Sequence, residues 1–140
     1  MKILLAESEA DIARCYPVMA ELRPHLSAAE FAVQVRRQQT LGFRLAYLEE
    51  AAEVCAVAGF RYLEMLAWGK ILYVDDLVAA PARRSRGHGG SLFGWLVEQA
   101  KLHDCNELQL DSGVQRFGAH RFYLAHRMVI NSHHFALKLK

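Results

Sequence analysis

The chain has 140 residues, 53% of them hydrophobic, which is the length and composition of one ordinary soluble domain, here residues 1–140. Its formal net charge of +2 excludes a broad basic field for nucleic acids or membranes. No apolar run is long enough for a membrane-spanning helix, and the N-terminal run is too short for a signal peptide, so a cytoplasmic location is expected.

The first elements in chain order are a strand and a helix. Residues 2–5 form a short apolar strand, and apolar residues at helical spacing run from Ile12 to Leu22. Pro17 interrupts this helical pattern, and proline is tolerated only in a first turn or at a kink. The helix is therefore expected either to start late or to bend at Pro17.

A second helix and a hairpin follow. Ser27 and Glu30 have the spacing of a capping box, which predicts a helix that continues to about Gln39. The apolar runs 43–48 and 54–60 have strand-like composition and are separated by acidic residues and alanines. We interpret them as the two strands of a hairpin, followed by a linking segment.

The second half of the chain alternates strands and helices. An apolar strand at 71–79 precedes a helix at about 87–103, whose apolar stripe belongs to the core. A strand at 107–111, a helix at about 115–126 and a terminal strand at 135–139 complete the pattern. The order β-α-α-β-β-β-α-β-α-β predicts an α/β sandwich with a mixed sheet.

The turn before the helix at 87–103 has the composition of a phosphate-binding loop. Gly87, Gly89 and Gly90 let backbone N–H groups approach an anion, and the positive end of the helix dipole adds attraction. Arginines at positions 83, 84 and 86 add positive charge. The Walker loop and the dinucleotide fingerprint do not fit, because Gly-Lys-Ser/Thr is absent and Leu92 stands where a third glycine is needed. The loop predicts a pyrophosphate cradle.

The spacing Arg84-x-x-Gly87-x-Gly89 matches the Gln/Arg-x-x-Gly-x-Gly/Ala signature of the coenzyme A loop in GNAT-superfamily N-acetyltransferases. Residues 71–78 resemble that family's fourth strand, residues 107–111 its fifth, and Ala119 to Tyr123 the Ala-x-x-x-Tyr of the next helix. The chain resembles this superfamily. The resemblance implies a GNAT-type α/β sandwich, with a mixed central sheet splayed between strands four and five and with flanking helices.

The resemblance also implies an activity. The expected reaction moves an acetyl group from acetyl-CoA to a primary amine of a small molecule by direct attack. The alternatives are a protein N-terminal or lysine acetyltransferase, and a non-catalytic domain that binds acyl-CoA. The expected partner is a small-molecule amine, with neither nucleic acid nor membrane, and a homodimer stays open.

The resemblance places the cofactor against the end of the fourth strand and the glycine loop. Backbone N–H groups near Val78 and Ala79 are the expected oxyanion donors. Arg116 stands where relatives often carry an asparagine that contacts the cofactor, and His88 is expected to use only its backbone. The implied cofactor-binding set also includes Leu77, Arg84, Ser85, Arg86, Gly87, Gly89, Gly90 and Ser91.

Three residues are the expected catalytic groups. Tyr123 matches the family tyrosine that protonates the leaving thiolate, although a core aromatic is the ordinary alternative. Asp75 and Asp76 are the leading candidates for the base, because successive strand residues face opposite sides and one should face the substrate. Three alternatives remain. Both carboxylates are solvated or paired with arginines, Glu64 is the base, or the proton leaves through water without a dedicated base.

The cysteines and histidines predict no metal site. Cys15, Cys55 and Cys105 are widely spaced within apolar patterns and are expected to be core thiols. His120 and His126 are six residues apart on different helix faces, and the adjacent histidines at 133 and 134 point to opposite sides of a strand. Structural or surface roles are expected for most of the histidines.

Overall fold

Five strands form one sheet in the order β1-β2-β3-β4-β5 in the computed structural model. Their bounds are β1 Lys2–Leu5, β2 Arg44–Glu50, β3 Glu53–Met65, β4 Gly69–Ala79 and β5 Glu107–Leu110. The first four strands are antiparallel to their neighbours, and β5 runs parallel to β4. The expected α/β class with a mixed sheet is confirmed, whereas the splay between β4 and β5 stays a prediction.

The structure describes the backbone of residues 1–140 and every side chain except those of residues 83–85. The chain divides into two units, Met1–Gln109 and Leu110–Lys140, which are described separately. In the described part of the chain, no helix has both the length and the apolar character needed to cross a bilayer. That one domain spans residues 1–140 stays a prediction.

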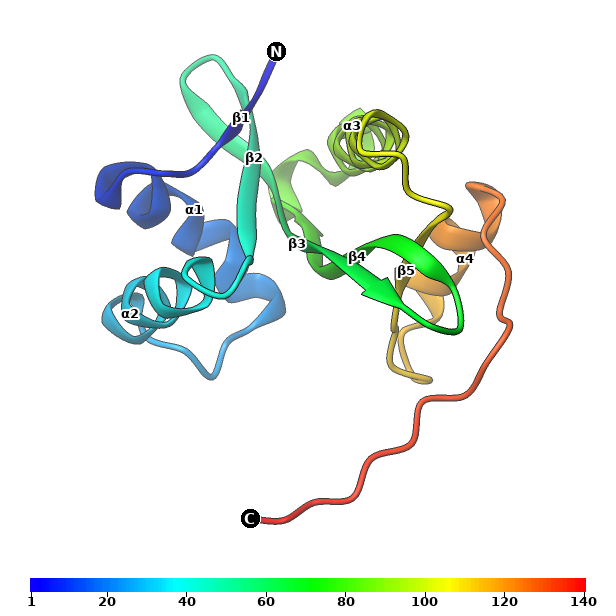
Figure 1. Ribbon diagram of the computed structural model, residues 1–140. Coiled ribbons are helices and arrows are strands. Elements are labelled where there is room, and N and C mark those ends of the chain that lie inside the picture. Colours follow the sequence, from blue (N-terminus) through cyan, green and yellow to red (C-terminus); the bar gives the residue numbers. More distant parts are fainter. The chain divides into compact units, whose positions relative to one another are not determined.

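Helices cover both faces of the sheet in the first unit. These are α1 Glu9–Leu22, α2 Ala28–Gln39 and α3 His88–Leu102. Figure 1 shows α1 and α2 on one face and α3 on the other. The second unit contains α4, Phe117–Ala125.

Two apolar layers hold the first unit together. Toward α1 and α2, the core includes Ile12, Phe31, Leu45, Tyr47 and Val57. Toward α3, the ring of Phe60 meets that of Trp95 edge to face, with centroids 5.8 Å apart. Each fully buried large apolar side chain contributes roughly 1.5–3 kcal/mol through burial, so the sheet is fixed between its helices.

Side-chain caps define the first two helices. The Ser27 hydroxyl accepts a hydrogen bond from the Glu30 N–H at 3.1 Å, and the Glu30 carboxylate accepts one from the Ser27 N–H at 3.2 Å. The predicted capping box is therefore confirmed. The first helix is capped by Ser8 and begins at Glu9, well before Pro17. The expectation of a late start is wrong, because the cap at Ser8 sets the beginning of the helix.

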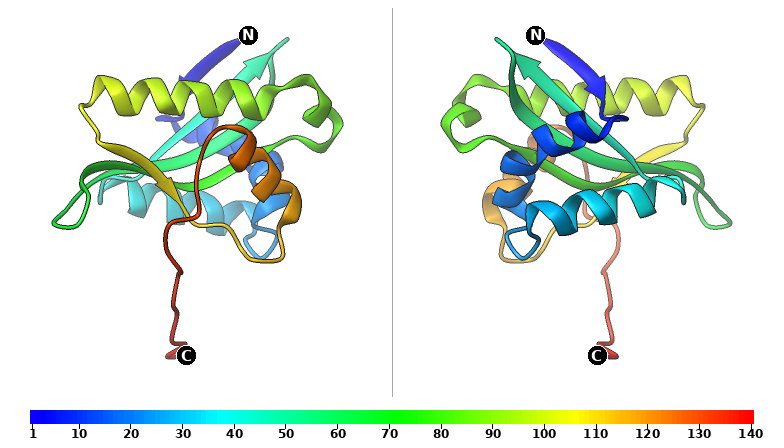
Figure 2. Two further views of the ribbon diagram at one scale, coloured as in Figure 1. Left: turned by 90° about the vertical axis from the view of Figure 1, so that its right-hand side faces the viewer. Right: turned by 90° about the vertical axis from the view of Figure 1, so that its left-hand side faces the viewer.

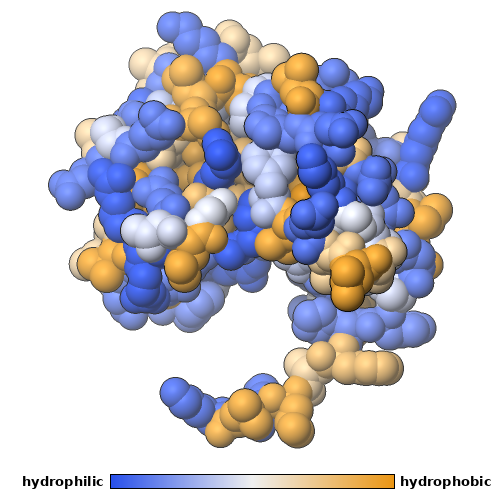
Figure 3. Space-filling view, in the orientation of Figure 1, coloured by the Kyte–Doolittle hydropathy of each residue, from blue (hydrophilic) through white to orange (hydrophobic). Residues whose placement is uncertain are grey.

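Two segments differ from the expectation. The expected link after residue 60 is instead a long hairpin, since β3 runs to Met65 and β4 begins at Gly69. The predicted terminal strand is absent from the described backbone, and the exposed end of the chain is drawn in red in Figure 2. Phe135 is 91% exposed, and hydrophobic residues lie open to solvent along this segment (Figure 3). Alternating apolar residues form a strand only beside a pairing edge.

Candidate active site

The glycine loop joins the end of β4 to the start of α3. The chain leaves β4 at Ala79, makes one 3-10 helix, η1 at Pro81–Arg86, and enters α3 through Gly87. Gly87 has φ 76° and ψ 15°, a left-handed conformation that favours glycine. The N–H groups of the first helical turn have no acceptor inside a helix, and this helix has neither a side-chain cap nor an acidic residue in its first turn. The arrangement suits an anion.

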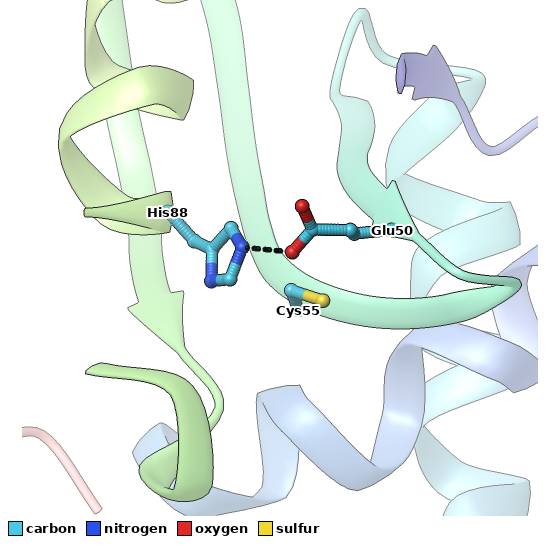
Figure 4. Close-up of side chains that lie close together, drawn as sticks. All are labelled: Glu50, Cys55 and His88. Atoms are coloured by element: carbon cyan, nitrogen blue, oxygen red, sulfur yellow. Dashed lines mark hydrogen bonds and ion pairs between the residues drawn. The ribbon is translucent and has the colours of Figure 1, made fainter. Parts of the chain in front are cut away.

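Contacts with β2 and β3 hold the glycine loop in place. The Ala80 N–H donates to the Cys55 carbonyl of β3 at 2.8 Å. The His88 side chain is buried, 3% exposed, and its Nε2 lies 2.8 Å from Oε2 of Glu50 in β2. Because the imidazole points at Glu50 (Figure 4), His88 presents only its backbone to a ligand at the loop.

Gly89 has room for a side chain in the free protein. A Cβ built on Gly89 would lie 3.9 Å from the Cβ of Ala79, an ordinary van der Waals distance. Packing among the described residues therefore does not require glycine at position 89.

The remaining residues of the expected cofactor set lie along β4, the loop and α4. Val78 is buried, whereas Leu77 and Ala79 are half-buried at the end of β4. Gly90 and Ser91 are half-buried in the first turn of α3, and Arg86 is exposed. The side chains of Arg84 and Ser85 lie outside the described residues. Arg116 is exposed at the N-cap of α4, in the second unit.

Asp75 and Asp76 lie at an irregularity of β4. Gly59 of β3 pairs with Asp76, and Phe60 pairs with Val74, so Asp75 is an extra residue in a β-bulge. The bulge breaks the alternation of side chains, and both carboxylates bind arginines on the α1–α2 side of the sheet. The expectation that the two carboxylates face opposite sides is wrong for this reason.

Each carboxylate has a different arginine. Arg23, the C-cap of α1, donates from Nε to Oδ1 of Asp76 at 2.8 Å. Arg61 donates to both oxygens of Asp75, at 3.0 and 2.6 Å, and its guanidinium lies over the ring of Phe43. The ion-paired alternative is thus what the structure shows. The partners come from α1 and β3, and neither belongs to the glycine loop.

The two carboxylates differ in their remaining capacity to accept a proton. Asp75 is held at both oxygens, and this hydrogen bonding raises the pKa of Arg61. Burial raises the pKa of Asp76, although its hydrogen bond from Arg23 opposes the shift. Among the described side chains, Arg23 is the one hydrogen-bonded to Asp76, through Oδ1, and Oδ2 packs against Gly59. Asp76 is therefore the better proton acceptor of the pair.

A cavity of about 280 Å³ opens beside Asp76 in the first unit. Its polar lining is Asp76 with its partner Arg23, His25 and two glutamines of α2, and its apolar lining comes from α1, α2, the segment between them and the residue before β2. The lining residues are Met19, Arg23, His25, Leu26, Phe31, Gln34, Val35, Gln38, Phe43 and Asp76. A cavity that combines one carboxylate, its arginine partner, an imidazole and two amide groups with apolar walls suits a small ligand that has both polar and apolar parts.

Gly59 allows the Asp76 carboxylate to lie against β3. A Cβ on Gly59 would be 2.5 Å from Oδ2 of Asp76 and 2.6 Å from the Phe43 ring. We expect Gly59→Ala to displace the carboxylate and to lower the free energy of unfolding by about 1–3 kcal/mol, as overpacking does. Chemical denaturation measures this. Gly94→Ala, at an exposed helical glycine with open space around it, should instead be neutral or stabilising.

Tyr123 belongs to α4 in the second unit and lines a cavity of about 480 Å³ there. Burial raises the pKa of the Tyr123 phenol, which keeps the hydroxyl protonated at neutral pH. Ser112 lines the same cavity, and its buried Oγ has no hydrogen-bond partner among the described residues. An unsatisfied buried hydroxyl beside a phenol is a site for a polar ligand group.

The structure adds residues that the sequence did not single out. Arg23, Arg61 and Gly59 are 14 or more positions away from the carboxylates that they contact. The one local signal is Gly59 itself, since a glycine inside a strand often marks a close approach. Ser112 lies two residues after the end of β5 at Leu110, and polar residues that follow strand ends are common ligand contacts. Glu64 is exposed and lies opposite Lys70 in the β3–β4 register. It is five residues along β3 from Gly59, the residue opposite Asp76.

Comparisons with known proteins point to one family. The sequence matches the model of the Acetyltransferase (GNAT) family over residues 7–127. It is 31% identical over 117 residues to the uncharacterized N-acetyltransferase YhdJ of Bacillus subtilis (strain 168), covering 83% of this chain and 82% of that protein.

Solved structures with a similar fold include two acetyltransferases. An acetyltransferase from Trypanosoma brucei superimposes with a TM-score of 0.78 at 19% identity, covering 99% of each chain. A ribosomal-protein-alanine N-acetyltransferase from Brucella melitensis biovar Abortus 2308 superimposes with a TM-score of 0.84 at 14% identity, covering 99% of this chain and 100% of that one. At these identities the structures show the fold alone.

Proposed function

This chain belongs to the GNAT acetyltransferase family, and from that membership we propose that it transfers the acetyl group of acetyl-CoA to a primary amine of a small molecule. The observation that carries the proposal is the position of Asp76. It lines a small cavity three residues before Ala79, on the strand that leads into the glycine loop. At about 3.4 Å per residue, acceptor site and loop are roughly 10 Å apart along one strand.

The glycine loop fits the pyrophosphate of acetyl-CoA. Gly87 turns the chain into α3, and the N–H groups of the following residues point from an uncapped helix start. The free space at Gly89 leaves the approach to these N–H groups open. The exposed Arg86 adds a positive charge at the end of η1. These residues would bind the diphosphate through their backbone and keep the thioester near the end of β4.

The acceptor amine would bind in the Asp76 cavity. An ammonium group is attracted to the carboxylate, and the raised pKa of Asp76 makes it a stronger base than an ordinary carboxylate. Arg23 holds one oxygen of Asp76 and leaves the other for the amine proton. Gln34 and Gln38 supply amide groups that would orient other polar atoms of the acceptor.

In the proposed reaction, the acceptor nitrogen forms a bond to the acetyl carbon and the carbon–sulfur bond breaks. The acceptor ammonium first loses one proton to Asp76, directly or through water, and the second proton, lost after the nitrogen attacks, restores the Tyr123 hydroxyl through solvent. The thiolate that leaves takes a proton from the Tyr123 hydroxyl, which burial keeps protonated. Negative charge on the acetyl oxygen would be stabilised by backbone N–H groups near Val78 and Ala79.

The size of the cavity favours a small amine over a protein. About 280 Å³ is the volume of a small-ligand site, and its lining comes from helices α1 and α2 rather than from an extended edge that would pair with a peptide. The Brucella melitensis neighbour is a ribosomal-protein-alanine N-acetyltransferase, so a protein N-terminus remains the second candidate acceptor.

Calorimetric titration with acetyl-CoA and with free CoA tests the proposal first, followed by an amine panel in which released thiol is measured. Micromolar binding of the cofactor with thiol release on one class of small amine is the expected result. Binding without turnover on any amine or peptide would identify a non-catalytic domain that binds acyl-CoA. No binding of either compound would contradict the proposed function.

We expect Asp76→Asn to lower turnover by about 100-fold or more with little change in acetyl-CoA affinity, because the amide cannot accept the amine proton. The active form of Asp76 is ionised, so the turnover rate of the wild-type protein should fall as pH drops through the raised pKa of this carboxyl. The pH–rate profile of the variant should lack that acidic limb. A retained limb would exclude Asp76 as the base, and Asp75→Asn, at the carboxylate held by Arg61, is the matched comparison.

A further inference from the structure

Three metal-ligating side chains meet beneath the glycine loop. Glu50 ends β2, Cys55 lies near the start of β3, and His88 begins α3. Their ligand atoms all lie within 4.8 Å of one another, and Figure 4 shows the three side chains close together. The proposed acetyl transfer uses none of these side chains.

The fold brings the three residues together through local irregularities. Leu48 pairs with Ala56 and Glu49 pairs with Val54, so Cys55 is an extra residue in a bulge of β3. The hairpin between Glu50 and Glu53 turns through two alanines at positive φ, 53° and 62°. Bulges redirect side chains, and this one lies where the hairpin meets the start of α3.

We propose that Glu50, Cys55 and His88 bind one divalent transition-metal ion of the zinc type. A nitrogen, a sulfur and a carboxylate oxygen form the mixed donor set that Zn²⁺ accepts, with a fourth position left for water. Binding breaks the Cys55 S–H bond and forms a metal–sulfur bond, and the proton is released to solvent. Thiolate and carboxylate together then balance the charge of the ion.

The burial of the three groups fits such a site. Cys55 is fully buried and His88 is 3% exposed, so both are held by packing, whereas the Glu50 side chain is 41% exposed and gives an ion a path from solvent. Zn–N, Zn–O and Zn–S bonds of about 2.0–2.3 Å place tetrahedral ligands roughly 3.5 Å apart, so ligand atoms that lie within 4.8 Å of one another approach by about 1.3 Å at most, and the 2.8 Å between His88 and Glu50 widens by roughly 0.7 Å. Rotation of the partly exposed Glu50 side chain accommodates the widening.

A bound ion would connect the hairpin to the glycine loop. His88 directly follows Gly87, the residue that turns the chain into α3, and Cys55 accepts a hydrogen bond from Ala80 through its carbonyl. The ion would therefore join both ends of the loop to the β2–β3 hairpin. This site is distinct from the Asp76 cavity and does not depend on the acetyl-transfer proposal.

Cobalt titration of the full chain tests the site. The protein is treated with a chelator, dialysed and titrated with Co²⁺, which absorbs in the near ultraviolet when a thiolate binds it. We expect one Co²⁺ per chain with this thiolate absorption, and its loss in Cys55→Ser. Glu50→Gln and His88→Gln should weaken Co²⁺ binding by more than about tenfold, since loss of even an outer-shell partner costs about 10–100-fold.

Cys105→Ser is the matched control, because Cys105 is a partly exposed thiol outside the cluster, and its variant should keep the absorption. A wild-type protein without thiolate absorption, or a Cys55→Ser variant that retains it, would overturn the site. If circular dichroism shows that Cys55→Ser does not fold, Glu50→Gln and His88→Gln decide, since both keep the thiol. Undiminished Co²⁺ affinity in both would contradict the proposal.

Discussion

Gly89→Glu is expected to abolish measurable acetyl-CoA binding while the protein stays folded. The added carboxylate would face the pyrophosphate, and like charges brought together cost several kcal/mol, so at about 1.4 kcal/mol per tenfold we expect a loss of about a hundredfold or more. The fold should hold because, among the described atoms, a Cβ at position 89 has the Ala79 Cβ as its neighbour at an ordinary 3.9 Å. Glutamate in a first helical turn is also favoured by the helix dipole. Calorimetry with acetyl-CoA measures the loss.

Gly94→Glu is the matched control for this experiment. Gly94 lies in the same helix, is exposed, and has no neighbour within 4 Å of a built Cβ. The same charge is therefore added to α3, one and a half turns from the loop. Affinity should be preserved in Gly94→Glu. Equal losses in both variants, or retained affinity in Gly89→Glu, would show that the first turn of α3 does not bind the pyrophosphate.

Tyr123→Phe is expected to lower turnover by about 100-fold or more and to leave acetyl-CoA affinity nearly unchanged, because only the proton donor is removed. Burial raises the pKa of Tyr123, so the hydroxyl carries its proton across the neutral range. On the alkaline side, the wild-type rate should begin to fall above the ordinary tyrosine range. That alkaline limb should be missing in the variant, and a steady-state pH–rate profile measures it.

Tyr62→Phe is the control for the loss of a tyrosine hydroxyl. The Tyr62 hydroxyl bonds to His103 Nδ1 at 3.0 Å, and Tyr62 lines neither the Asp76 cavity nor the Tyr123 cavity. Turnover of this variant should stay close to wild type. An unchanged rate in Tyr123→Phe as well would remove Tyr123 from the reaction and favour its alternative as a core aromatic.

Local signals predicted most elements of the fold. The capping box at Ser27 and the glycine before His88 each mark a helix start, and the structure places helices there. Two expectations failed for different reasons. The first helix does not start late, because the local cap at Ser8 sets its start and Pro17 lies inside α1, whereas the pattern at 135–139 has no pairing strand in the described structure. Caps act within a few residues, whereas strand pairing depends on a distant edge.

Part of the candidate site is a prediction from the sequence. Residue types at fixed spacing along the chain indicate the glycine loop and Tyr123, and their roles stay predictions. The sequence does not indicate the bulge at Asp75, because a strand irregularity depends on the register with β3. The pairing of Asp76 with Arg23 joins residues 53 positions apart, so no local sequence pattern predicts this contact.

The sequence by itself determined the family, the α/β class and the loop that suits a diphosphate, since these depend on residue types at short spacing. The tertiary structure decided how the two carboxylates are bound among the described side chains, because Arg61 donates to both oxygens of Asp75 and Arg23 donates to Oδ1 of Asp76. It also placed Cys55 beside His88. Both results depend on how β-bulges direct side chains toward segments far away in the chain, and packing of the whole sheet sets that direction.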